Sequence, residues 1–127
     1  MELYFPTEMP ERLAFLSALV VAGFGLLTML FPARLLRAGG LVTGEITSVG
    51  FGATRSIGGL HLGLGLAAIA LAQNFTYLML GSALGFAAFG RLLSLFVDRG
   101  RIVINALVLI AQLVLAALPL GYVFGYF

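Results

Sequence analysis

The chain has 127 residues, of which 61% are hydrophobic and 9% charged, and its formal net charge is +2. Soluble domains have about a quarter of their residues charged, so this composition excludes an ordinary soluble fold. The absence of Cys excludes a disulfide framework, a CxxC redox centre and a thiolate metal site. All seven basic residues are Arg. They form no basic stripe with interleaved aromatic residues, so we expect no nucleic-acid partner.

Long uncharged stretches of the sequence predict transmembrane helices. The 35 residues between Arg55 and Arg91 carry no charge. A bilayer core about 30 Å thick is crossed by ~20 helical residues, so this stretch fits two spans. The polar pair at 73–74 lies near its middle, where the chain would turn back. The uncharged runs 13–33 and 102–127 supply one span each.

We therefore predict an all-α integral membrane protein, a four-helix bundle of up-down-up-down topology in which residues 1–127 form a single membrane domain. The expected helices are about 12–31, 48–72, 75–97 and 102–125. Pro32 should end the first helix, because a proline disfavours helical geometry at the residue before it. The segment 32–47 then indicates a short interfacial piece followed by a turn. The residues before the first span do not have the positive charge of a signal peptide, so we expect that span to be retained.

The distribution of Arg predicts the orientation in the membrane. Arg34, Arg37, Arg99 and Arg101 lie in the first and third connections, whereas the opposite side has only Arg12. Cytoplasmic loops carry an excess of basic residues. We therefore expect a multi-pass protein of the bacterial inner membrane with both termini in the periplasm.

Small residues predict where the helices pack. Lipid supplies no hydrophobic drive between helices, so small residues and buried polar groups must hold a membrane bundle together. The glycines that we expect at helix contacts are Gly58, Gly59, Gly63, Gly65, Gly81 and Gly85. The second span has glycine on two faces, and we therefore expect it to be the most buried of the four.

The third and fourth spans each have one distinctive face. Phe86, Phe89 and Phe96 share a face of the third span that we expect to contact lipid, with Arg91 turned away from it. Asn105, Gln112 and Pro119 recur every seven residues along one line of the fourth span. Asn105 and Gln112 are expected to donate hydrogen bonds between helices rather than to bind a ligand.

Two arginines lie inside the predicted membrane region. Arg55 and Arg91 are each ~10 Å from the cytoplasmic interface, given a rise of 1.5 Å per residue. Asp98 and Glu45 are the candidate counter-charges, and Asn105 lies at a similar level, so a polar cluster is predicted in the cytoplasmic half. The arginines could extend to the interface and act as packing residues. They could instead bind an anionic headgroup or a polar tail, or line a transport pathway.

His61 lies near the predicted bilayer midplane. It could relay protons, bond to a quinone-like carbonyl, or ligate a cofactor. The plainer interpretation is a neutral imidazole bonded to a neighbouring helix. With one His and no Cys, a zinc or iron–sulfur site within one chain is not expected, and no metal site is predicted. No nucleophilic triad can be built, so no catalytic residue is predicted.

Two short motifs resemble a family of small bacterial membrane proteins. They are Arg55-Ser-Ile-Gly58-Gly59, at the start of a glycine-rich helix, and Gly90-Arg91-Leu-Leu-Ser94-Leu-Phe-Val-Asp98, at the end of the next. The family is a domain of unknown function, similar in layout to the DoxX-like proteins. The resemblance covers the second to fourth helices and marks Arg55, Gly59, Arg91 and Asp98 as family-type positions. It implies four spans and an accessory or quinone-linked role.

The sequence favours a non-catalytic structural or accessory subunit, or an oligomeric bundle. Its expected partners are the lipid bilayer and either further copies of itself or a larger membrane complex. The alternative is a binder or carrier of a lipophilic ligand, a quinone or a lipid, that uses Arg55, His61 and Arg91. An ion or proton pathway is the weaker third hypothesis. No other cofactor is expected.

Overall fold

The computed structural model describes residues 5–40, 43–98 and 102–126, and this part of the chain contains helices and no strand. In chain order the elements are α1 (Met9–Leu30), α2 (Pro32–Ala38), the 3-10 helix η1 (Thr43–Glu45), α3 (Ser48–Leu71), α4 (Asn74–Val97) and α5 (Ile102–Phe124). The four long helices, of 22, 24, 24 and 23 residues, are each long and apolar enough to cross a membrane. The predicted all-α fold with four transmembrane helices is confirmed, and the chain is a multi-pass membrane protein.

Prolines set both ends of the first long helix. α1 begins at Met9, three residues earlier than predicted, because Pro10 lies in the first turn, where its missing N–H is not needed. The helix ends at Leu30, because Phe31 precedes a proline and adopts a non-helical conformation with φ −127°. Pro32 then starts α2, a short helix in the segment where the sequence predicted an interfacial piece without specifying its conformation.

Polar caps define the ends of α3 and α4. The side chain of Thr47 accepts a hydrogen bond from the Gly50 N–H at 3.1 Å, which fixes the start of α3. α3 ends at Leu71, and the residue after it, Ala72, adopts the left-handed conformation with φ 48°. Gln73 and Thr76 exchange reciprocal capping bonds at the start of α4. Only residues 72–73 connect the two helices, so the predicted tight hairpin is confirmed.

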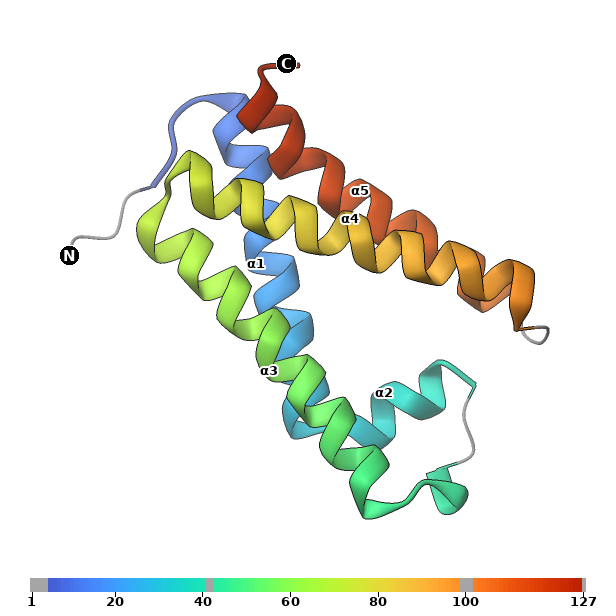
Figure 1. The fold of residues 1–127 in the computed structure, drawn as a ribbon. Coiled ribbons are helices and arrows are strands. Elements are labelled where there is room, and N and C mark those ends of the chain that lie inside the picture. Colours follow the sequence, from blue (N-terminus) through green and yellow to red (C-terminus); the bar gives the residue numbers. More distant parts are fainter. Residues whose placement is uncertain (1–4, 41–42, 99–101, 127) are drawn as a thin grey trace.

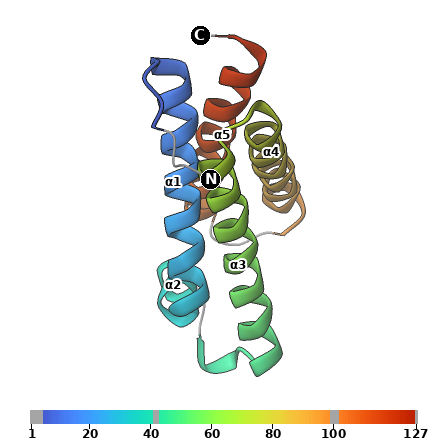
Figure 2. The ribbon, with the colours of Figure 1, turned by 90° about the vertical axis from the view of Figure 1, so that its left-hand side faces the viewer.

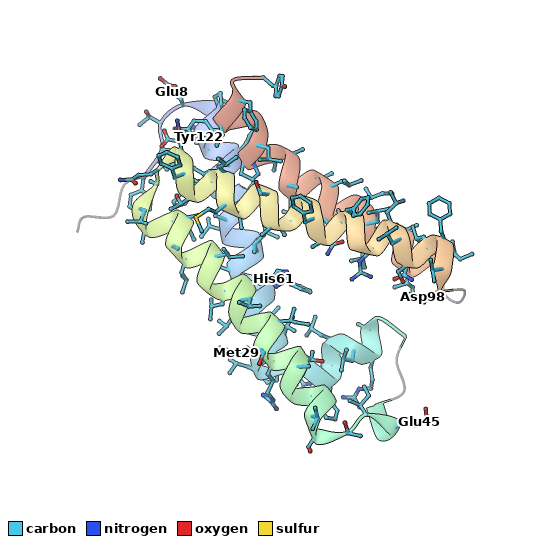
Figure 3. The ribbon with its side chains drawn as sticks, in the orientation of Figure 1. Glu8, Met29, Glu45, His61, Asp98 and Tyr122 are labelled. Carbon is cyan, nitrogen blue, oxygen red and sulfur yellow. The ribbon has the colours of Figure 1, made fainter. Side chains whose placement is uncertain are left out.

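The four long helices form two antiparallel pairs, α1 with α3 and α4 with α5 (Figure 1). The pairs meet at one end and diverge toward the other, as a second view also shows (Figure 2). The start of α1, the α3–α4 hairpin and the end of α5 all lie at the shared end. Glu8 and Tyr122 mark this end in Figure 3. The two ends of the described chain therefore lie on the same side of the protein.

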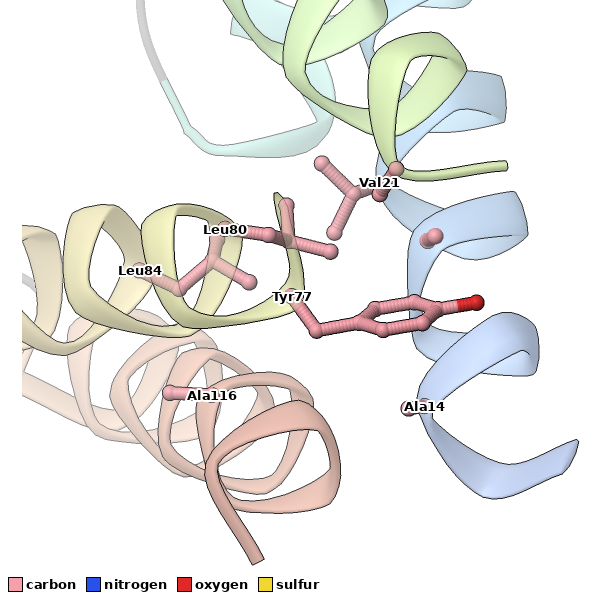
Figure 4. Packing of buried hydrophobic residues seen from close by; sticks show 8 residues of the cluster. Ala14, Val21, Tyr77, Leu80, Leu84 and Ala116 are labelled. Carbon is pink, nitrogen blue, oxygen red and sulfur yellow. The ribbon is translucent and has the colours of Figure 1, made fainter. Parts of the chain in front are cut away.

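The core lies where the two pairs meet (Figure 4). All four long helices contribute buried side chains to it, namely Ala14, Ala18, Val21, Ala68, Tyr77, Leu80, Leu84 and Ala116. Tyr77 reaches from α4 toward α1, with Val21 and Ala14 on either side of its ring. Its ring packs edge-on against Tyr122 at 5.5 Å between centroids. The aromatic side chains fill the junction that the small side chains of α1 leave open.

A proline and a serine join the two pairs at this junction. Pro119 lies inside α5 and has no N–H, so it cannot donate the usual bond to the carbonyl of Leu115, four residues earlier. Ser17 of α1 donates a hydrogen bond to that carbonyl oxygen at 2.6 Å. Both Ser17 and Pro119 are fully buried. The carbonyl that the proline leaves without a helical donor is thus satisfied by the other pair.

The prediction that α3 is the most buried helix is wrong. In the apolar segment of α1, 39% of the residues are buried, against 17% in α3. α1 contacts both α3 and α5, whereas α3 has its main neighbour on one side only. On the second glycine face of α3, Gly59 has only the Met29 sulfur of α1 nearby, and no other helix among the described residues packs against Gly52 or Gly63. Gly52 and Gly63 on this face have no other atoms within 4 Å of the position that a Cβ would occupy.

Candidate functional site

The α1/α3 contact brings two backbones close together. A Cβ added at Gly58 would lie 2.6 Å from the backbone nitrogen of Met29 and 2.7 Å from the carbonyl oxygen of Gly25. At Gly65 it would lie 2.7 Å from the carbonyl oxygen of Ala18. Real Cβ atoms do not approach backbone atoms so closely. The absence of a side chain at these positions therefore allows the two helices to pack as they do.

The predicted contact glycines divide into two groups. Gly58 and Gly65 lie in the α1/α3 contact, and Gly81 lies in the α4/α5 contact, where a Cβ would meet the side chain of Leu120. The other three predicted positions differ. Gly59 has only the Met29 sulfur nearby, at 3.8 Å, whereas Gly63 and Gly85 have nothing within 4 Å. Gly25, on the small-residue face that the first span was expected to bury together with Ser17 and Thr28, lies opposite Gly58 in this contact.

Arg91 joins α4 to α5 through two neutral amides. Its Nε donates a hydrogen bond to Gln112 Oε1 at 3.1 Å, and its Nη1 donates to Asn105 Oδ1 at 2.8 Å. The seven-residue spacing of Asn105 and Gln112 places both amides on one line of α5, so a single guanidinium can reach them. Both amides bond between helices as predicted, but they accept hydrogen bonds from Arg91, whereas they were expected to donate. Their common partner was not predicted.

Asp98 is not the partner of Arg91. It accepts a hydrogen bond from the Ser94 hydroxyl at 2.9 Å, one turn earlier in the chain, and is exposed at the end of α4. Within the described residues, both hydrogen bonds of the Arg91 side chain go to amides that carry no charge. The positive charge of Arg91 is therefore stabilised by the dipoles of two amides. Among the described residues, no carboxylate forms an ion pair with it.

Arg55 caps the end of α1 from the neighbouring helix. Its Nη1 donates to the carbonyl oxygen of Met29 at 2.7 Å and lies 3.5 Å from that of Leu30. The last carbonyls of a helix have no donor within the helix, and a positive charge is favourable at this end of the helix dipole. Within the described residues, Arg55 is therefore held by backbone carbonyls of α1 and not by the candidate counter-charges Asp98 and Glu45.

The predicted cluster around Arg55, Arg91, Asp98, Glu45 and Asn105 does not form. Arg55 bonds to α1, whereas Arg91 bonds to α5, and the two helix pairs diverge at the ends where these residues lie. Figure 3 shows Glu45 and Asp98 on different arms of the molecule. The sequence placed the two arginines at matching depth, but depth alone does not make two residues neighbours.

His61 bonds within its own helix. Its Nδ1 lies 2.8 Å from the carbonyl oxygen of Ile57, one turn earlier. Since a carbonyl oxygen only accepts, Nδ1 carries the proton in this arrangement. The ring also packs edge-on against Phe24 of α1, with 5.9 Å between centroids. The expected bond to a neighbouring helix is therefore replaced by an aromatic contact.

Comparisons with family models, with curated proteins and with solved structures find no match. The resemblance to DoxX-like proteins stays a prediction. Among the described residues, no group of three His, Asp or Glu side chains is arranged to hold a metal ion.

Proposed function

We propose that this protein is a non-catalytic membrane bundle that acts through protein contacts, as a homo-oligomer or as an accessory subunit of a larger membrane complex. The observation that carries this proposal is the open glycine flank of α3, defined by Gly52, Gly59 and Gly63. Apart from the backbone of α3 itself, no atom of the described residues lies within 4 Å of a Cβ position at Gly52 or Gly63, and only the Met29 sulfur lies near Gly59.

The glycine flank faces away from the rest of the protein. Ala68 packs into the core with Tyr77 of α4. At 100° per residue, Gly63 lies about 140° around α3 from Ala68. The glycine flank therefore points away from the α4/α5 pair. A helix of another chain could pack against α3 on this side.

The composition of the glycine flank differs from that of a lipid-facing surface. On α4 the outward surface includes the large side chains of Phe86, Phe89 and Phe96, with exposed fractions of 78%, 56% and 77%. Glycine inside a helix costs about 1 kcal/mol relative to Ala, and contact with lipid offers no compensation. Close packing of a second helix does offer it, because small residues allow two backbones to approach.

We place the protein in the bacterial inner membrane with both termini in the periplasm. The support is the arginine distribution, with four basic residues on one side of the spans and Arg12 on the other. The described ends of the chain lie together, as an even number of spans requires. A lipophilic-ligand site built from Arg55, His61 and Arg91 together has less support, because Arg55 and Arg91 lie on different helix pairs.

Native mass spectrometry after gentle solubilisation tests the assembly. We expect a mass above the 13.4 kDa of one chain. Multiples of that mass would identify a homo-oligomer, and an added protein of another mass would identify a complex. Gly63→Phe should return the protein to a single chain by blocking the glycine flank. Phe86→Ala, on the lipid-facing surface of α4, is the matched control and should change nothing. A single chain in the unmodified protein would contradict the proposal.

A further inference from the structure

Three arginines meet around a hollow at the end of the α1/α3 pair that lies farthest from the core. The hollow has a volume of about 340 Å³ and lies between the end of α1, α2 and the first turns of α3. Arg34 and Arg37 come from α2, and Arg55 comes from α3. Phe31 and Phe51 form part of its apolar wall. No acidic residue is among the described residues that line it.

The arginines are arranged so that each retains free donors. Arg55 uses Nη1 for the carbonyls of α1, and within the described residues its Nε and Nη2 make no hydrogen bond. The guanidinium of Arg34 lies over the ring of Phe31, with 5.4 Å to the ring centroid, which fixes its position without using its N–H groups. Arg37, one turn after Arg34, is exposed.

Like charges around one hollow repel each other unless an anion lies among them. Guanidinium groups match phosphate oxygens in geometry and can donate two bonds to one phosphate. Basic pockets beside membrane helices on the cytoplasmic side suit anionic lipid headgroups, and the arginine distribution places this hollow on that side. The exposed ring of Phe31 at its rim offers an apolar surface beside the charged groups.

We propose that this hollow binds a phosphate group, carried by an anionic membrane lipid or by a soluble phosphate, through Arg34, Arg37 and Arg55. The site is independent of the glycine flank of α3, which lies on residues that do not line the hollow. An experiment that finds no phosphate binding would therefore leave the proposal of assembly through the glycine flank unaffected.

Lipid binding is measured on the intact purified protein in a neutral detergent by native mass spectrometry. Phosphatidylglycerol, phosphatidylcholine and inorganic phosphate are titrated separately. The test variant is R34Q/R37Q, because Arg34 and Arg37 are exposed and, within the described residues, their side chains donate no hydrogen bond to the fold. Arg12→Gln at the opposite end of α1 is the matched control. Its Nε bonds to the carbonyl of Pro6, far from the hollow. Unchanged melting temperatures without ligand confirm that the variants fold.

We expect phosphatidylglycerol to bind about 25-fold more weakly to R34Q/R37Q, since each basic residue near an anionic headgroup contributes about fivefold. Arg12→Gln should bind normally, and phosphatidylcholine should bind weakly to every form because its choline offsets the phosphate charge. Binding of inorganic phosphate with the same dependence on Arg34 and Arg37, without a preference for the lipid, would identify a soluble ligand. Equal phosphatidylglycerol and phosphate binding by the wild type and R34Q/R37Q would overturn the proposal.

Discussion

The two helix pairs solve the same packing problem by different means. In the α1/α3 pair, Gly25, Gly58 and Gly65 let the backbones touch. In the α4/α5 pair, Leu120 packs against Gly81 while Arg91 bonds to the amides of α5. Because lipid is as apolar as the side chains, neither pair gains from burying hydrophobic surface as a soluble bundle does. The first pair therefore depends on shape, and the second depends in part on hydrogen bonds.

The largest expected effect follows from the backbone contact of the first pair. Gly58→Ala should lower the free energy of unfolding by about 3 kcal/mol, at the upper end of overpacking costs, because the atoms in the way are backbone atoms of α1. Gly81→Ala should cost only ~1 kcal/mol, because the nearest atoms belong to the flexible side chain of Leu120. Unfolding with a denaturing detergent in mixed micelles measures both values.

Gly23 provides the control for the backbone contact. It also lies in α1, but nothing lies within 4 Å of its Cβ position, so Gly23→Ala should not destabilise the protein. A cost at Gly58 no greater than at Gly81 would mean that the two pairs pack alike.

The second expected effect concerns the hydrogen bonds of the α4/α5 pair. Arg91→Leu should lower the free energy of unfolding by about 1 kcal/mol, because bonds between membrane helices average ~0.6 kcal/mol each and Arg91 makes two. Gln112→Leu removes one of these bonds and should cost about half as much. The same unfolding experiment compares them. An Arg91→Leu variant as stable as the wild type would show that these bonds contribute nothing and that both pairs rely on shape.

The smallest expected effect lies at the junction of the pairs. Ser17→Ala should cost about 0.6 kcal/mol, the average for a bond between membrane helices. In a Pro119→Ala background the same change should cost nearly nothing, because the alanine N–H can bond to the carbonyl of Leu115 within α5. A double-mutant cycle measures this coupling. Equal costs in both backgrounds would mean that Pro119 does not create the acceptor that Ser17 uses.

The sequence predicted the individual helices better than their partners. Apolar length located the four spans, Pro32 located the end of α1, and the polar pair at 73–74 located the hairpin. These signals are local. The seven-residue line of α5 also predicted a polar face, because periodicity fixes which residues share a face.

The contacts between helices were harder to predict. Glycine on two faces of α3 suggested two neighbours within the chain, but only one face is packed. Matching depth suggested that Arg55 and Arg91 meet, but they lie on different pairs. The periodicity of a sequence shows which residues share one face of a helix, but it does not show which other helix packs against that face. The junction between Ser17 and Leu115 depends on residues 98 positions apart, and no local pattern links them.

Because the core lies at one end of the molecule, a small change in the angle between the helix pairs would produce a large displacement at their far ends. The 24 residues of α3 extend about 36 Å from the junction, at 1.5 Å per residue. A tilt of ~10° between the pairs would move the far end of this helix by ~6 Å, by the same rise per residue. A change in side-chain volume at Ala14 or Ala116, small in itself, would therefore be magnified at the arginine-lined hollow. A change in the angle between the pairs at the core would thus change the distance between the far ends of the two arms.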